Sequence, residues 1–164
     1  MSEEFDRFEE HMAGELLDPY EVFAEQMETR FPKMLDKGYG GFACGNGWWP
    51  ILEALCVNIQ GHIDWKNNTR AKLLEDNPYN HPIPDKVEQV VVRQIKEKFG
   101  GLRFYYDGGD DEISGMVRMA ESWASRACET CGAPGTSGGQ GWIRTLCPTH
   151  RAEADALYEE RFKK

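Results

Sequence analysis

The sequence predicts an α+β fold in which helices pack on one face of a β-hairpin or small antiparallel sheet, with a treble-clef-like zinc finger at the C-terminal end. Three observations predict it: apolar residues recur at helical spacing, a β-branched and aromatic segment contains a two-glycine turn, and two close pairs of metal-binding residues follow. We expect a body over residues 1–127 and a zinc-binding unit over residues 128–164 that packs on this body and is not independent.

Two helices are expected before the hairpin. Asp18-Pro19 is typical of an N-cap followed by proline at the first helical position, and this helix should end near Gly38. Its apolar residues are Tyr20, Val22, Phe23, Met27, Phe31 and Leu35. A Gly-rich loop over residues 38–47 precedes the second helix, whose apolar residues are Trp48, Trp49, Pro50, Ile51, Leu52, Leu55, Cys56, Ile59, Ile63 and Trp65. Residues 67–85 are expected to form a frayed helix end and a surface loop.

Residues 87–106 are predicted to form a β-hairpin that turns at Gly100-Gly101. Alternation divides its side chains between two faces. The expected core face carries Val91, Ile95, Phe99, Leu102, Phe104 and Tyr106, and the expected outer face carries Gln94, Lys96, Lys98, Arg103 and Tyr105.

A third helix is expected over residues 112–127, capped by Asp110 or Asp111. Its predicted buried residues are Ile113, Met116, Val117, Ala120, Trp123 and Ala124. One core should contain Trp48, Ile51, Leu55, Ile59 and Trp123.

The clearest chemical signal is two pairs of possible metal ligands, Cys128/Cys131 and Cys147/His150, with a Gly-rich segment between the pairs. Two residues separate the ligands of each pair, which is the spacing of a tetrahedral zinc site. Four protein ligands leave no position for a reacting water, so a structural zinc is expected rather than a catalytic one. The alternative is a set of reduced, free thiols. Cys44 and Cys56 remain outside the site, and a disulfide between them is disfavoured in a reducing compartment.

Charge narrows the set of partners. The net charge is −9, and eleven acidic residues stand against three basic ones in residues 1–36. Those acids are Glu3, Glu4, Asp6, Glu9, Glu10, Glu15, Asp18, Glu21, Glu25, Glu28 and Asp36, and the bases are Arg7, Arg30 and Lys33. We therefore expect neither generic nucleic-acid binding nor membrane association. The acidic N-terminal sequence and the lack of a long apolar run favour a cytoplasmic protein.

The outer face of the hairpin is the candidate ligand surface. Lys96, Lys98 and Arg103 offer donors to an anion, and Tyr105 offers a ring for stacking. The simpler interpretation is a solvated sheet face whose charges maintain solubility.

Two other motifs have a chemical and a structural interpretation. The run Gly108-Gly109-Asp110-Asp111-Glu112 matches the hairpin motif of diguanylate cyclases, but a helix is expected after it, which favours a turn and a helix cap. Cys44 in its Gly-rich loop could act as a nucleophile with His62 or His81 as base, whereas a plain turn with a small buried thiol is the structural interpretation.

Three segments together resemble a known group of sequences: Gly47-Trp48-Trp49-Pro50-Ile51-Leu52, the run from Gln94 to Tyr106, and the C-terminal ligand pairs. The chain is similar over residues 40–150 to small uncharacterised proteins of tailed phages and prophages. This resemblance implies a phage-type origin and transfers no activity.

Two functions remain open at this point. The favoured one is a zinc-stabilised interaction protein that binds a host macromolecule or sequesters an anionic small ligand, for example in counter-defence. The alternative is a small hydrolase or nuclease that uses His, Asp or Cys residues outside the zinc site, although no combination of acid, base and nucleophile stands out in the sequence.

Overall fold

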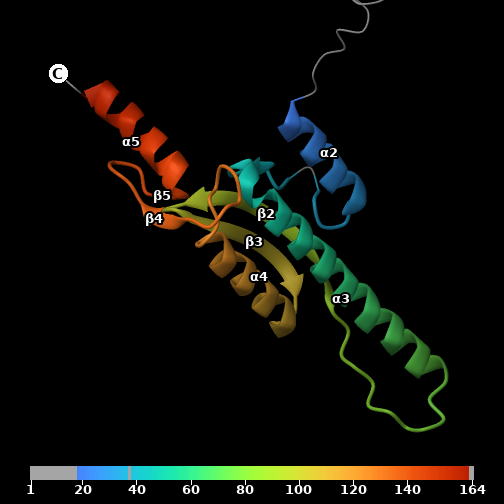
Figure 1. Ribbon diagram of the computed structural model, residues 1–164. Helices are drawn as coiled ribbons and strands as arrows, with labels where there is room; N and C mark the ends of the chain where they lie inside the picture. The colour runs from blue at the N-terminus through green and yellow to red at the C-terminus, as the bar shows by residue number, and fades with distance from the viewer. Residues whose placement is uncertain (1–17, 37, 163–164) are drawn as a thin grey trace, which may run out of the picture.

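The computed structural model describes residues 18–36 and 38–162 and confirms the α+β class (Figure 1). In chain order the elements are α2 (Pro19–Arg30), β1 (Phe42–Ala43), the 3-10 helix η1 (Asn46–Trp48), α3 (Trp49–Glu75), β2 (Glu88–Lys98), β3 (Gly101–Gly109), α4 (Asp111–Ala124), β4 (Thr136–Gly138), β5 (Arg144–Leu146) and α5 (Pro148–Phe162). Within this described part of the chain, no helix has the length and apolarity that crossing a bilayer requires.

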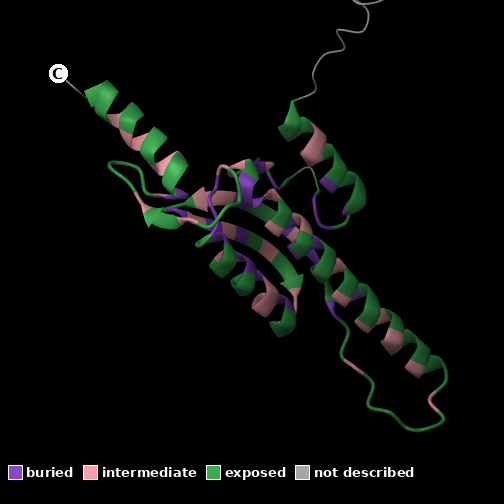
Figure 2. Ribbon diagram, in the orientation of Figure 1, coloured by how far each residue is buried: buried purple, intermediate pink, exposed green. Residues whose placement is uncertain are grey.

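The body consists of a three-stranded sheet covered on one face by helices. The strand order is β1-β2-β3, with β1 parallel to β2 and β2 antiparallel to β3. Helices α3 and α4 lie side by side over the sheet, and α2 packs beside α3, where the ring of Phe23 stacks on Trp49 at 4.6 Å (Figure 1). The buried residues lie between these helices and the sheet (Figure 2).

Helix α2 is shorter than predicted. It ends at Arg30, because Phe31 precedes Pro32 and a residue before proline is forced out of the helical region. Phe31 has φ −126° and ψ 51°, and the chain then turns so that Met34 and Leu35 are buried outside any helix. The Met34 carbonyl accepts a hydrogen bond from the Val92 N–H at 2.8 Å, so this turn is joined to the sheet.

Helix α3 buries most of the expected apolar residues in the core, and it continues to Glu75 beyond the expected fraying point. Its buried residues are Leu52, Leu55, Cys56, Ile59 and Ile63. Asn67 holds the chain after the following loop, because its side chain exchanges two 2.9 Å hydrogen bonds with the backbone of Val87. Trp65 is 64% exposed, so its assignment to the apolar stripe was wrong.

The hairpin turns one residue earlier than expected. Phe99 and Gly100 have φ of 53° and 77°, and they connect Lys98 to Gly101 as a two-residue turn. Two positive φ values are typical of a type I′ turn, whose twist matches that of a hairpin. Phe99 is therefore at the turn and 73% exposed, not in the core.

An irregularity in the ladder between Val92 and Gln94 changes the alternation along β2. As a result Val90, Val92 and Ile95 are buried, and Val91, which was assigned to the core face, is only half-buried. On β3 the expected residues Leu102 and Phe104 are buried and Tyr106 is half-buried.

Helix α4 begins at the predicted cap, since the Asp110 side chain accepts from the Ile113 N–H at 3.0 Å. It ends at Ala124, and Ile113, Val117, Ala120 and Ala124 are buried as expected. Trp123 is 67% exposed, so the prediction that it shares the core with Trp48 was wrong. Trp48 is fully buried instead, and its Nε1 donates to the Ala127 carbonyl at 2.8 Å.

Replacing Leu55 with alanine should reduce the free energy of unfolding by roughly 2 to 5 kcal/mol, because Leu55 on α3 is 4% exposed and belongs to the main core cluster. Denaturant titration measures this loss. Leu74→Ala on the same helix is the control, since Leu74 is exposed and its truncation should change stability by less than about 0.5 kcal/mol. Equal effects of the two substitutions would show that the buried face of α3 is assigned incorrectly.

Candidate metal centre

Two local structures position the ligand pairs. Cys128 and Cys131 flank a tight turn soon after α4, in which the Gly132 N–H donates to the Cys128 carbonyl at 2.7 Å. Gly132 has φ 76°, which a residue with a side chain rarely adopts, so this turn favours glycine at that position. Cys147 ends the segment after β5, and His150 lies in the first turn of α5. Proline at the start of α5 fits because its missing N–H has no helical partner there.

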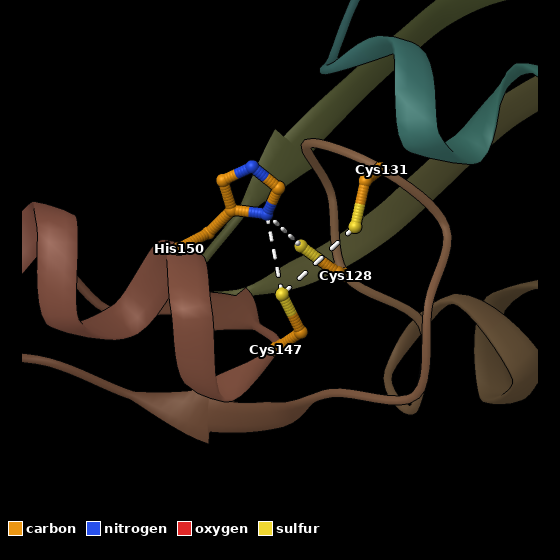
Figure 3. Close-up of side chains that lie close together, drawn as sticks. All are labelled: Cys128, Cys131, Cys147 and His150. Carbon is orange, nitrogen blue, oxygen red and sulfur yellow. Dashed lines mark hydrogen bonds between the residues drawn. The ribbon is translucent and has the colours of Figure 1, made fainter.

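The four side chains converge on one point (Figure 3). Their donor atoms all lie within 4.8 Å of one another. The Cys131 and Cys147 sulfurs are 3.9 Å apart, and His150 Nδ1 lies 3.4 Å from the Cys128 sulfur and 3.2 Å from the Cys147 sulfur. A tetrahedral ion with metal–sulfur bonds of about 2.3 Å would place two sulfurs about 3.8 Å apart. The Cys3His group therefore has the geometry to hold a metal ion through the four predicted ligands.

Backbone N–H groups around Cys128 favour its thiolate form, which is the form that binds a metal cation. Burial of Cys128 opposes a negative charge, but backbone N–H groups of Cys147, Cys131 and Thr130 point to its sulfur and lower the pKa of Cys128 to about 6. The Ala133 N–H lowers the pKa of Cys131, yet burial and the neighbouring sulfurs outweigh it and raise that pKa. Hydrogen bonds to Cys128 and Cys147 raise the pKa of His150. Three sulfurs and one imidazole nitrogen this close together cannot all be deprotonated without repelling one another. A divalent cation removes that repulsion, because it replaces the protons and binds all four atoms.

The turn that carries Cys128 and Cys131, which we call the knuckle (residues 128–132), is fixed to the loop before α3. The Gly47 N–H donates to the Glu129 carbonyl at 2.8 Å, and the Gly45 N–H donates to the Glu129 carboxylate at 3.0 Å. Any side chain on Gly47 would collide with the Cys128 carbonyl and with the backbone nitrogens of the knuckle. Glu129 was not predicted as important, because nothing in the sequence distinguishes it from an exposed residue between two ligands.

A second set of contacts joins the metal-binding unit to the hairpin turn of the body. The hydroxyl of buried Thr145 donates to the Gly100 carbonyl at 2.6 Å. Trp142 Nε1 donates to Glu97 at 3.2 Å, and the same carboxylate accepts from the Gly100 N–H at 2.6 Å. The unit thus contacts the body both at the start of α3 and at the end of β2.

The predicted basic residues lie together on the hairpin, on the outer side of the sheet. Lys96 is opposite Arg103 in the register, and the Lys96 ammonium lies 5.5 Å from the centre of the Tyr105 ring. Arg103 donates to the Leu102 carbonyl at 2.8 Å, and Lys98 lies over the Phe99 ring. In the described ranges, Lys96, Lys98 and Arg103 form no ion pair with a carboxylate, whereas the nearby Arg93 pairs with Asp107 at 2.7 Å.

The structure also places the residues considered for catalysis. Burial raises the pKa of the Cys44 thiol to about 12, with a further contribution from Glu129, so Cys44 is a protonated thiol. His62 faces two carboxylates, with Nε2 2.9 Å from Asp110 and Nδ1 3.5 Å from Glu112. His81 lies on the exposed loop after α3. Neither the thiol nor His62 has the free, activated state that a nucleophile or base requires.

His62, Asp110 and Glu112 form a second group with metal-binding spacing. Lys66 occupies the position of a cation here, because its ammonium lies 3.2 Å from Asp110 and 2.7 Å from Glu112. Burial alone would raise the pKa of Asp110, but hydrogen bonds from His62, the Ile113 N–H and Lys66 outweigh it and lower the pKa to about 2. This group therefore joins α3 to the start of α4 as an ion-pair network. It also explains the Gly-Gly-Asp-Asp-Glu run as a strand end and a helix cap.

In comparisons with known protein families, curated proteins and solved structures, the chain matches none.

We expect one metal ion per chain, bound by Cys128, Cys131, Cys147 and His150. Elemental analysis of the purified protein measures the stoichiometry, and a chelator should lower the unfolding temperature because the ion stabilises only the folded state. Cys131→Ser should lose the metal and the chelator response, whereas Cys44→Ser should keep both. Purified wild-type protein without bound metal, prepared in metal-replete medium, would contradict the site.

Asp110→Ala should reduce the free energy of unfolding by about 1 kcal/mol or more at neutral pH, because it removes a helix cap and the partner of Lys66. The folded-state pKa of about 2 is below the ordinary value of 3.8, so the stabilisation is present above pH 3.8 and is lost as the pH falls towards 2. Denaturant titrations of both proteins across this range should show the difference shrinking. Asp111→Ala, one residue along, is the control, and a pH-independent difference for Asp110→Ala would contradict the network.

Proposed function

We propose that this is a zinc-stabilised interaction protein without catalytic function, whose outer sheet face binds an acidic host protein surface or an anionic small ligand. The resemblance to small phage proteins supports a role in the cytoplasm of an infected bacterial cell. The proposal has two parts, the identity of the ion and the nature of the partner surface.

Zinc is supported by the chemistry of the ligands. Three thiolates and one imidazole in a tetrahedral arrangement suit Zn²⁺, whereas harder cations prefer oxygen ligands. The ligand turn, the β4–β5 hairpin and the following helix α5 have the order of a treble-clef finger. Because four protein ligands complete the coordination of a tetrahedral ion, its role is structural: it holds together a segment that contributes only Leu146 and the ligands Cys128 and Cys147 to its own small buried cluster.

The observation that carries the proposed function is the cluster of unpaired cations on the hairpin. Lys96, Lys98 and Arg103 lie together, and none of them pairs with a carboxylate of the residues that the structure describes, in a protein whose net charge is −9. Acidic side chains outnumber basic ones in this chain, and most basic side chains could therefore find an acidic partner within it. Basic side chains that have no such partner are available to a negatively charged ligand or protein surface. An arginine fork and two ammonium groups can hold a carboxylate or a phosphate, and Tyr105 adds a partly exposed ring at the same face.

The hydrolase or nuclease alternative has less support in the described residues. Its thiol candidate is protonated, and its best histidine is held between two carboxylates. The interaction function needs no activated group and uses a surface that is already assembled, so we favour it.

Lys98→Ala combined with Arg103→Ala should weaken binding to two defined anionic probes, inorganic tripolyphosphate and a glutamate-rich peptide. Binding should also become less sensitive to salt, because each lost charge removes a screened attraction. Isothermal titration at two salt concentrations measures both effects. The free energy of unfolding should change by less than about 0.5 kcal/mol, as is usual for surface substitutions.

The matched control is Lys72→Ala with Arg161→Ala, which removes the same charge from exposed positions on α3 and α5. This control should bind the probes as the wild type does. Undiminished binding by the Lys98/Arg103 variant would exclude the hairpin face, and loss of host-protein capture only on changing the acidic residues in 1–36 would move the interaction site there.

A further inference from the structure

An apolar groove of about 860 Å³ runs between α3 and α4 on the side away from the sheet. Its floor includes Ile51, Ala54 and Leu55 of α3 and Met116 and Ala120 of α4. Met119 and Trp123 border it and are 71% and 67% exposed. A tryptophan and a methionine this exposed beside a groove are typical of a surface that another segment covers.

Gly115 lines the same groove in the middle of α4. A side chain added there would meet only the end of Arg118, at 3.9 Å, so packing within the described fold does not require glycine at this position. Glycine destabilises a helix interior, and its presence here fits the close approach of another backbone to the groove.

Unpaired positive charge lies on α4 and just after its end. Arg118 on the exposed side of α4 and Arg126, two residues after the helix ends, form no ion pair with any residue of the described ranges. At the opposite end of the groove, Glu112 is already paired with Lys66. Arg118 lies beside Gly115, which lines the groove, so among the described residues the free charge next to the groove is basic and fits an acidic occupant.

The chain itself contains a sequence of this character in residues 1–17. Phe5, Phe8 and Met12 are spaced by three and four residues, which is the spacing of anchors that enter a groove from one side of a helix. The remaining positions carry six acids against one base, Arg7; the acids are Glu3, Glu4, Asp6, Glu9, Glu10 and Glu15.

The described chain begins at Asp18, and the first turn of α2 that follows lies beside the start of α3. Tyr20, in the first turn of α2, has its ring centre 6.3 Å from that of Trp49, and Trp49 is followed by Pro50 and Ile51, which line the groove. Five extended residues, 13–17, span about 17 Å, which exceeds the width of one helix, about 10–12 Å. A connection of this length is long enough to cross the first turn of α3.

We propose that residues 5–12 of this chain bind in the α3–α4 groove, with Phe5, Phe8 and Met12 on its apolar floor and the acidic positions beside Arg118 and Arg126. This intramolecular contact covers Met119 and Trp123. A partner that binds the same groove has to displace the N-terminal segment, which makes the segment a built-in competitor and gives the protein a second interaction surface besides the hairpin face.

Hydroxyl-radical footprinting of the full-length protein tests the proposal, with modification of Met119 and Trp123 read by mass spectrometry. Buried Met34 and exposed Tyr79 serve as internal references. Phe8→Glu with Met12→Glu should increase modification of Met119 and Trp123 several-fold and leave both references unchanged. Ala13→Glu with Gly14→Glu adds the same charge in the connection and should keep the wild-type protection. Arg118→Glu with Arg126→Glu should expose Met119 and Trp123 partially, and more so at low salt.

Equal modification of Met119 and Trp123 in the wild type and in the Phe8/Met12 variant would overturn the proposal. Light scattering at the footprinting concentration distinguishes the remaining occupant, a second copy of the chain. Protection that disappears on dilution together with a dimer would assign the groove to that copy and would also overturn an intramolecular contact.

Discussion

The structure depends on one close backbone contact, between Gly47 and the knuckle that carries Cys128 and Cys131. The Gly47 N–H donates to Glu129, and no side chain fits at this point. Because Trp48 follows directly and bonds to Ala127 while fully buried, the contact fixes the start of α3 against the end of α4. Cys128 and Cys131, two of the candidate metal ligands, flank this contact, so the candidate metal site and the central helix are held by the same few residues.

The hairpin turn serves two purposes at once. Gly100 bonds to Thr145 of the metal-binding unit, while the strands on either side of the turn present Lys98 and Arg103 on the outer face. Phe99 adopts φ 53°, which is uncommon for a residue with a side chain and persists only where its surroundings determine the conformation. Here the hydrogen bonds from the Gly100 N–H to Glu97 and from the Thr145 hydroxyl to the Gly100 carbonyl fix the conformation of the turn. The orientation of the basic face is thus set partly by the metal-binding unit.

The sequence was sufficient where the signal is local. Ligand spacing identified the candidate metal site, and the start of α4 was predicted to be capped by Asp110 or Asp111, of which Asp110 is the cap, because each signal depends on a few neighbouring residues. Predictions failed where contacts between residues far apart in the sequence decide which side chains are buried. The irregularity after Val92 changes which residues of β2 face the core. Helical spacing alone assigned Trp65 and Trp123 to the core, but no described helix or strand covers these two side chains, and both are exposed. The contacts of Glu129 with Gly45 and Gly47 join residues more than eighty positions apart, and no local sequence pattern predicts them.

The separation of these contacts along the chain bears on the order of assembly. The metal ligands lie within 22 residues of one another, whereas the bond from Gly45 to Glu129 spans 84 residues. The entropy lost on closing a loop grows with its length, so the short metal loop closes with the smaller loss. We therefore expect the loop between the four candidate metal ligands to close before the contact between Gly47 and the knuckle forms, so that the knuckle presents an ordered surface against which the start of α3 packs.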